Sequence, residues 1–372
     1  MKNFLTLIAF AVFSFSTVNA KTTIKINAAG DTYYATDNDK SVGLDERQLA
    51  NTNIFKDRFG TNNVLLNASA TSDFWRANVA IATYGDPMMP EEANIGLKLF
   101  DNLWATGGLY AIWDMDYTFN NWFTGNSLTD LYAMSNGPFM AWGLEYGFND
   151  DVTLGVGLMN SGVWGPYELY GFNGDNNRSK TFYTKLDWEN LFNDWSLVAF
   201  CIYGNEADWG FKHHLNIMQI HLGLRGTIVE NLEAQINGKF VSVTPDVDSV
   251  DALNGITLQA LLRYRFNEKF AAGCRFSFNN QGVYTYHPNI PWLHNGKSEY
   301  SWSGIDLGLV AEYNPTPFTY LRLEGGMVSL SADSDIEDNF SKIFYNGDKY
   351  VSSRLGVALS MGFRFNLYET VK

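Results

Sequence analysis

The chain has 372 residues, and its 26 basic and 40 acidic side chains give a formal net charge of −14 at pH 7. This acidic balance argues against a nucleic-acid ligand, because phosphate binding needs a basic surface. Aromatic residues make up 16% of the chain, and there are 33 glycines but only 9 prolines. That composition favours a large β-barrel with aromatic girdles, with a strongly acidic soluble protein as the alternative.

Residues 1–20 have the features of a cleaved secretory signal. Lys2 gives a positive start, Phe4 to Phe15 form a short apolar run, and Ala20 ends the segment with a small residue. The run is too short to span a bilayer as a helix, and no later segment approaches twenty continuous apolar residues. We therefore expect a signal peptide over 1–20, one barrel domain over 21–372, and a location in the outer membrane of a Gram-negative envelope.

The rest of the chain alternates between strand-like segments and polar connectors. The expected strands lie near 22–34, 62–71, 74–83, 92–100, 103–112, 138–148, 152–160, 180–189, 195–204, 214–227, 231–243, 255–266, 269–279, 301–313, 318–330 and 350–366. Short connectors such as Asn267-Glu268 alternate with long ones such as 113–137, which is typical of short periplasmic turns and long outer loops. The fold class is therefore all-β, an antiparallel transmembrane β-barrel of about 16 strands, with 14 as the alternative.

The last expected strand shows the clearest separation of two faces. Its apolar face, at every second position, comprises Leu355, Val357, Leu359, Met361, Phe363 and Phe365. The opposite face is small or cationic and includes Arg354 and Arg364. A soluble β-sandwich strand would also alternate with a period of two, but a sandwich does not sort its loops by length. The pattern thus favours lipid on one side and water on the other.

Several segments resemble the β-barrel porin-2 family of OmpL-like outer-membrane porins. They are AAGDTYYATDND, RFGTNNVLLNASATSDFWRANVAIATYGD, EANIGLKLFDNLWATGGLYAIW and LGVGLMNSGVW, and the resemblance covers residues 25–280. It implies a last strand that ends in an aromatic residue read by the barrel assembly machinery. Phe363 and Phe365 fit this assembly signal, although seven residues follow Phe365.

Charged side chains on the non-lipid face of the strands are the candidate pore wall. These residues are Arg263, Arg265, Arg275, Arg354, Arg364, Glu312 and Glu324. On the lipid face each charge would cost about 2–4 kcal/mol at mid-membrane, so these residues are expected to face water. They either form a basic channel wall or simply pair with one another across neighbouring strands.

The long connector 113–137 is the candidate constriction loop. Porins in general fold their third loop into the barrel, and this connector resembles that loop by order and length. Asp114, Asp116 and Asp130 would face the wall arginines and set up a field across the pore. Trp122 and Phe123 either pack the loop against the wall or stack on sugar rings.

No residue pattern predicts catalysis or a metal site. The five histidines have no motif-level serine or carboxylate partner, so the chain is expected not to be an enzyme and to have no catalytic residues and no cofactor. The acidic group Asp246, Asp248 and Asp251 does not match calcium-loop spacing. Cys201 and Cys274 lie in separate strands and are expected to be unpaired.

These observations predict a porin for passive diffusion of small hydrophilic solutes and ions. The alternatives are a channel that prefers oligosaccharides and a structural or adhesive outer-membrane barrel. Expected partners are outer-membrane lipid, lipopolysaccharide and the barrel assembly machinery, and a homotrimer and a monomer both remain open. No nucleic-acid partner is expected.

The loop pattern predicts which segments face the outside of the cell. Protease added to intact cells should cut within 280–300 or 331–349 and spare Asn267-Glu268, because short turns face the periplasm. Mapping the cleavage sites by mass spectrometry checks this. Cleavage at the short turns from outside would contradict the topology.

Overall fold

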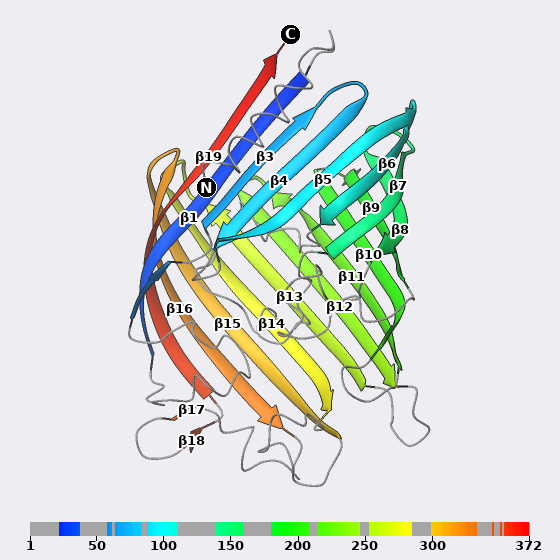
Figure 1. Cartoon of the computed structure of the whole chain (residues 1–372). Coiled ribbons are helices and arrows are strands. Elements are labelled where there is room, and N and C mark those ends of the chain that lie inside the picture. Colours follow the sequence, from blue (N-terminus) through cyan, green and yellow to red (C-terminus); the bar gives the residue numbers. More distant parts are fainter. Residues whose placement is uncertain are drawn as a thin grey trace.

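A computed structural model describes most of the chain after residue 21. The described residues are 22–37, 58–61, 64–83, 88–110, 139–159, 180–192, 194–207, 214–245, 253–284, 299–332, 344–345, 350–351 and 353–371. They form a tilted, antiparallel β-barrel (Figure 1). Within these ranges no helix is long and apolar enough to cross a membrane.

The barrel has 16 strand positions. Its strands are β1 (Thr22–Asp37), β2 (Arg58–Thr61), β3 (Val64–Thr71), β4 (Trp75–Thr83), β5 (Met88–Phe100), β6 (Leu103–Tyr110), β7 (Phe139–Gly147), β8 (Val152–Met159), β9 (Thr181–Phe192), β10 (Trp195–Ala207), β11 (His214–Val229), β12 (Leu232–Pro245), β13 (Leu253–Arg265), β14 (Phe270–Tyr284), β15 (Glu299–Thr316), β16 (Thr319–Ala332) and β19 (Ser353–Val371). The short strands β2 and β3 both pair with β1 and share one position. A separate hairpin consists of β17 (Phe344–Tyr345) and β18 (Tyr350–Val351).

Each barrel strand pairs antiparallel with the strand before it in the chain, and the ring closes where β1 meets β19. That final ladder runs from Thr22↔Val371 to Asp37↔Gly356 without a register shift. Closure pairs the edges that an open sheet would expose. The first and last strands of the chain therefore depend on each other.

The short turns gather at one end of the barrel, at the top of Figure 1. Asparagine and aspartate side chains stabilise them. The Asn267 side-chain oxygen accepts hydrogen bonds from the backbone N–H groups of Lys269 (2.9 Å) and Phe270 (3.0 Å). Asn231, in the turn between β11 and β12, has a φ of 67°, which asparagine tolerates better than most residues.

The prediction of an antiparallel barrel of about 16 strands is confirmed, including β1 and β10, which alternate poorly in sequence. Several strands are longer than predicted. Strand β5 begins at Met88 rather than at 92, so the connector between the expected strands 74–83 and 92–100 is shorter than predicted. Strand β19 continues to Val371, so Phe365 lies within the strand rather than near its end. These extensions are stabilised by backbone pairing with a neighbour, as between Val371 and Thr22.

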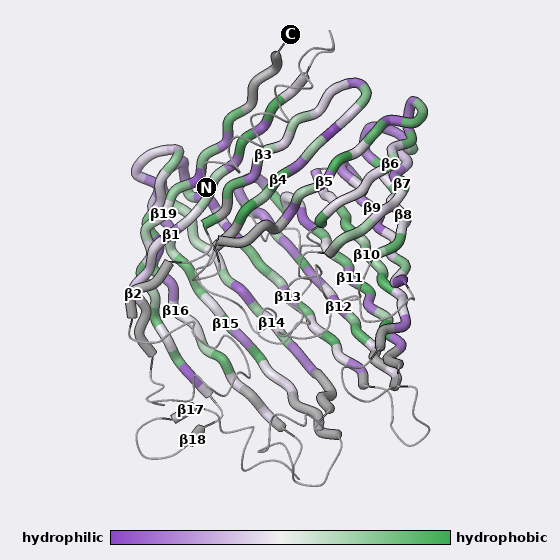
Figure 2. The backbone as a smooth tube through the Cα atoms, viewed as in Figure 1, coloured by the Kyte–Doolittle hydropathy of each residue, from purple (hydrophilic) through white to green (hydrophobic). Residues whose placement is uncertain are grey.

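The two faces of the barrel wall differ in polarity. On β19, Leu355 and Met361 are 58% and 62% exposed, whereas Arg354 and Ser360 are 1% and 2% exposed. Figure 2 shows hydrophobic and hydrophilic residues interleaved along the strands. The alternation places apolar side chains on the outside and polar ones inside.

On the inner face of the barrel, the side chain of Tyr320 extends from β16 across β19 toward β1. Tyr320 of β16 lies beside Gly362 of β19, which in turn pairs with Asp31 of β1. The Tyr320 hydroxyl donates a 2.9 Å hydrogen bond to the Asp31 carboxylate. A side chain on Gly362 would overlap the Tyr320 ring and approach Asp31. Glycine therefore lets β16 and β1 contact each other over β19.

We expect Gly362→Ala to destabilise the barrel by about 1–3 kcal/mol, because the added methyl group displaces Tyr320. The matched control is Gly325→Ala, since a methyl group there meets no atom within 4 Å. The measurement is the unfolding temperature of the refolded protein in detergent, followed by circular dichroism. Equal unfolding temperatures for the two variants would show that the crossing does not depend on Gly362.

Candidate functional site

The inner wall carries most of the charged side chains of the described strands, assigned by the face they share along each strand. The basic ones are Lys25, Arg76, Lys98, Lys185, Arg225, Lys239, Arg263, Arg265, Arg275, Arg322, Arg354 and Arg364. The acidic ones are Asp31, Glu92, Glu145, Asp187, Glu189, Glu233, Asp306, Glu312 and Glu324. Among the side chains that the structure describes, the inner face thus presents both signs of charge, twelve basic and nine acidic residues.

One carboxylate gathers three arginines from three different strands. Glu312 of β15 accepts hydrogen bonds from Arg263 (2.6 Å), Arg322 (2.7 Å) and Arg364 (2.6 Å). The Arg322 and Arg364 guanidinium groups also lie 4.2 and 4.5 Å from the centre of the Tyr320 ring. We call these residues, together with Asp31, the Glu312 cluster.

Small residues on the intervening strand allow the long side chains of the Glu312 cluster to meet. Arg263 lies on β13 and Glu312 on β15, with Gly273 and Ala271 of β14 opposite them in the ladder. Neither small side chain blocks the space between Arg263 and Glu312 on the inner face. Arg263 and Glu312 can therefore form an ion pair although β13 and β15 are not direct neighbours.

A second group of buried ion pairs lies farther along the same wall. Arg275 of β14 pairs with Asp306 of β15 at 2.9 Å and lies 3.8 Å from Glu324 of β16. Their side chains are almost fully buried. Gly308, opposite Arg275 in the ladder, leaves room for the arginine to reach toward β16. Buried charges of this kind are costly unless they are paired.

The opposite wall, formed by β4 to β9, is more open to solvent. Arg76 forms an ion pair with Glu145, and its guanidinium lies 5.0 Å from the centre of the Trp104 ring. Lys185 pairs with Asp187 at 2.8 Å. The side chains of Arg76 and Lys185 are 34% and 46% exposed, whereas that of Arg275 is 3% exposed. Water therefore reaches the charged pairs of this wall more freely.

The structure brings the predicted wall residues into these groups. Arg263, Arg364 and Glu312 belong to the Glu312 cluster, and Arg275 and Glu324 to the second group. Arg265 pairs with Glu233 at 2.8 Å and is half-exposed.

Arg354, Phe363 and Phe365 lie on their predicted faces of β19. Arg354 is buried on the inner face, and Phe363 and Phe365 lie on the outer face of β19. The predicted constriction residues Asp114, Asp116, Trp122, Phe123 and Asp130 lie outside the described residues.

Sequence reasoning missed Asp31 and Tyr320. Tyr320 shares a face with Arg322 and Glu324 at every second position of β16, and Asp31 shares one with Tyr33 on β1. That spacing places both inside the barrel, but only the ladder between β1 and β19 brings Asp31 close to β16. The sequence of neither strand alone therefore indicates that Asp31 and Tyr320 are in contact.

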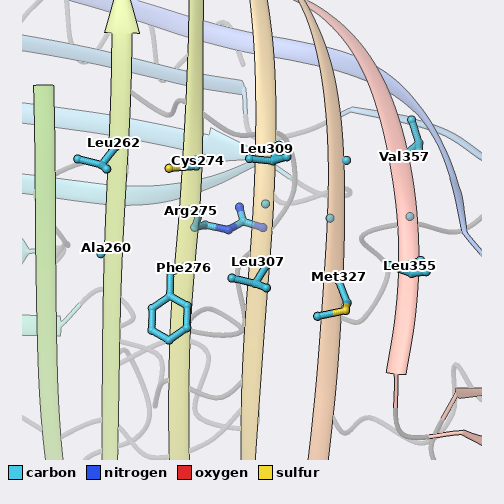
Figure 3. Close-up of a pocket in the computed structure, with 14 residues that line it drawn as sticks. Ala260, Leu262, Cys274, Arg275, Phe276, Leu307, Leu309, Met327, Leu355 and Val357 are labelled. Atoms are coloured by element: carbon cyan, nitrogen blue, oxygen red, sulfur yellow. The ribbon is translucent and has the colours of Figure 1, made fainter. Parts of the chain in front are cut away.

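An apolar groove of about 930 Å³ lies on the outer face of the barrel, away from the charged wall (Figure 3). Cys274, Leu309, Gly325 and Val357 lie side by side across β14, β15, β16 and β19 in its lining. Cys274 is a free, half-buried thiol, as is Cys201. Because the exposed side chains here are apolar, the groove is not part of a path for polar solutes.

Among the described residues, no group of three or more His, Cys, Asp or Glu side chains could hold a metal ion. His221 is buried on the inner face of β11. The chemistry that the inner wall offers is therefore charge pairing and hydrogen bonding to a polar solute. Such groups are suited to line a passage for polar solutes.

Comparison with protein families shows to which family the chain belongs. The family described as "Putative beta-barrel porin-2, OmpL-like" matches residues 23–365. The chain belongs to this family. The match extends the resemblance seen in the sequence through the last strand. No curated protein matches the chain.

Solved structures show the same fold as this porin-2 family member at low sequence identity. A loop-deletion variant of OmpT from Vibrio cholerae is 12% identical, with a TM-score of 0.58 over 92% of this chain and 99% of that one. An anion-selective porin from Comamonas acidovorans is also 12% identical, with a TM-score of 0.58 over 92% and 100%. The outer membrane channel DcaP of Acinetobacter baumannii is 10% identical, with a TM-score of 0.58 over 94% and 98%. The porin-2 chain is thus an outer-membrane β-barrel with a channel role.

We expect Glu312→Gln to lower the stability of the barrel by about 3–5 kcal/mol, because it leaves buried arginines without their shared counter-charge. The matched control is Glu145→Gln, which removes a partly exposed partner of Arg76 and should cost at most about 1 kcal/mol. The urea midpoint of the refolded protein in detergent measures both. A smaller effect at Glu312 than at Glu145 would contradict the importance of the Glu312 cluster.

Proposed function

We propose that this chain forms a water-filled channel for passive diffusion of small hydrophilic solutes and ions. The observation that carries the proposal is a closed barrel of 16 strand positions, apolar outside and charged inside. Barrels of eight strands are filled by side chains, whereas barrels of 16 strands leave an aqueous channel. In a lumen of a 16-stranded barrel, a charged wall favours water over lipid.

The partly exposed pairs along β4 to β9 support this proposal. Arg76–Glu145 and Lys185–Asp187 offer both signs of charge to a passing solute. A unit charge 4 Å from an opposite one gains about 1 kcal/mol in water and about 4 kcal/mol at an effective dielectric constant of 20. Such energies favour polar solutes without holding them tightly. This is what diffusion through a channel requires.

The proposal includes a constriction formed by the connector 113–137. Asp114, Asp116 and Asp130 would supply its acidic side, and Trp122 and Phe123 its aromatic side. The Glu312 cluster and the second group of ion pairs would supply the arginine-rich wall that it faces. An oligosaccharide-preferring channel is the second candidate, because aromatic rings stack on sugars.

Partners of the proposed channel follow from its outer surface. Lipid and lipopolysaccharide would surround the apolar outer face, and the assembly machinery would read the last strand near Phe363 and Phe365. A trimer form is described for Vibrio cholerae OmpT, which has the same fold, and we propose a homotrimer for this chain. We assign it no enzymatic role, and lipase and protease assays of the refolded protein test that part.

The refolded protein, residues 21–372, should produce stepwise ohmic conductance in a planar lipid bilayer. It should also let liposomes swell in small sugars and exclude large dextrans, because a wide wet lumen passes solutes by size. Block of the current by oligosaccharides would favour the sugar-preferring channel. Folded protein that inserts without any conductance would instead support the structural or adhesive alternative.

A further inference from the structure

Two parts of the inner wall differ in how far water reaches their charged side chains. Four inward side chains of β14 to β19 are each 4% exposed or less, namely Arg275, Asp306, Glu324 and Arg354. Four inward side chains of β4 to β9 are 25–46% exposed, namely Arg76, Glu145, Lys185 and Asp187. The β4 to β9 wall is therefore the one that offers charge to a solute in water.

Position along the barrel axis does not explain this difference. Lys185 lies seven residues before Phe192, where β9 ends next to a short turn. Ser277 lies seven residues after Phe270, where β14 begins next to a short turn. Because strands rise by a constant distance of about 3.3 Å per residue, the two residues lie at similar heights. Lys185 is exposed, whereas Ser277 is fully buried.

The exposed charges of β4 to β9 form one row that crosses two glycine positions. The Arg76 side chain lies over Gly96 of β5, where an added Cβ atom would be 2.7 Å from the guanidinium Nε, and it reaches Glu145 of β7. Gly155 of β8 lies between Glu145 and Lys185 in the ladder. We call this set the open row, and its charges alternate in sign in the order Arg76, Glu145, Lys185 and Asp187.

We propose that solutes cross the barrel along the open row, and that the row selects small zwitterions, which carry one ammonium and one carboxylate group. The inference rests on the proposed channel function and names its solute class. A single ion near the row meets attraction and repulsion together, because each charge lies beside its opposite. A zwitterion can place each of its two charged groups beside an opposite charge. Arg275, Asp306 and Glu324 are instead paired within the buried wall.

Coulomb's law sets the size of the expected preference. Two opposite unit charges 4 Å apart in water attract with an energy that corresponds to about a five-fold change in an equilibrium constant. The open row is partly exposed, and salt screens its charges over about 10 Å at 0.1 M. We therefore expect roughly a two-fold preference for a zwitterion over an uncharged molecule of the same size. The preference should decline at 1 M salt, where the screening length is about 3 Å.

The first test is thiol accessibility in the refolded mature protein, with Cys201 and Cys274 replaced by alanine. Lys185→Cys should react with a charged, membrane-impermeant methanethiosulfonate reagent, and the adduct should lower the single-channel current in a planar bilayer. The matched controls are Ser277→Cys on β14 and Ser360→Cys on β19, because both native side chains are buried. Since reaction requires access to the thiol, Lys185→Cys should react at least about ten-fold faster than either control.

The second test compares the entry of free glycine and of its uncharged isomer glycolamide into liposomes that contain the protein. After subtraction of the rates in protein-free liposomes, glycine should enter roughly two-fold faster at low salt. One variant neutralises the open row and should bring this ratio close to 1, namely Arg76→Gln, Glu145→Gln, Lys185→Gln, Asp187→Asn. It removes two charges of each sign, so the net charge of the chain is unchanged.

A control variant removes an ion pair of the other wall. Glu233→Gln, Arg265→Gln neutralises the pair near the short turn of β13 and should keep the native ratio. Equal reactivity of the thiols at 185 and 277 in a conducting channel overturns the path along the open row. Equal entry of the two isomers, or an equal fall in their ratio for both variants, overturns the selection of zwitterions and leaves the channel intact. A folded, inserted protein without conductance overturns the channel itself.

Discussion

Closure of the β1–β19 ladder is the constraint on which the rest of the structure depends. In lipid every backbone N–H and C=O must find its partner within the protein, and only a closed sheet satisfies both edges. The ladder from Thr22↔Val371 to Asp37↔Gly356 provides that closure between the two ends of the described chain. Tyr320, Gly362 and Asp31 add a side-chain contact across the same seam.

Once the ring is closed, the two-residue period of each strand decides where charge can lie. Apolar side chains face lipid, and the charged ones are directed into a lumen where they pair. Small residues such as Gly273 and Gly308 let arginines reach beyond the adjacent strand, so one carboxylate, Glu312, serves three of them. The same pairing stabilises the charged wall inside the barrel.

The period of two, together with the alternation of short and long connectors, was sufficient to predict a barrel of about 16 strands and which face of β19 is apolar. Strand ends were less predictable, because β19 reaches Val371 through pairing with β1 rather than through its own alternation. The faces of Arg263 and Glu312 could be read from sequence, but not their contact. That contact depends on the register of β13, β14 and β15, which no local pattern encodes.

The claim that the barrel wall separates lipid from the charged interior is tested most directly on β19. Nitroxide spin labels would be placed one at a time at residues 355–361, in a Cys201→Ala, Cys274→Ala background reconstituted into lipid vesicles. The structure predicts that collision with lipid-soluble oxygen alternates, high at 355, 357, 359 and 361 and low at 356, 358 and 360. Uniform oxygen accessibility, or maxima at the even positions, would contradict the account.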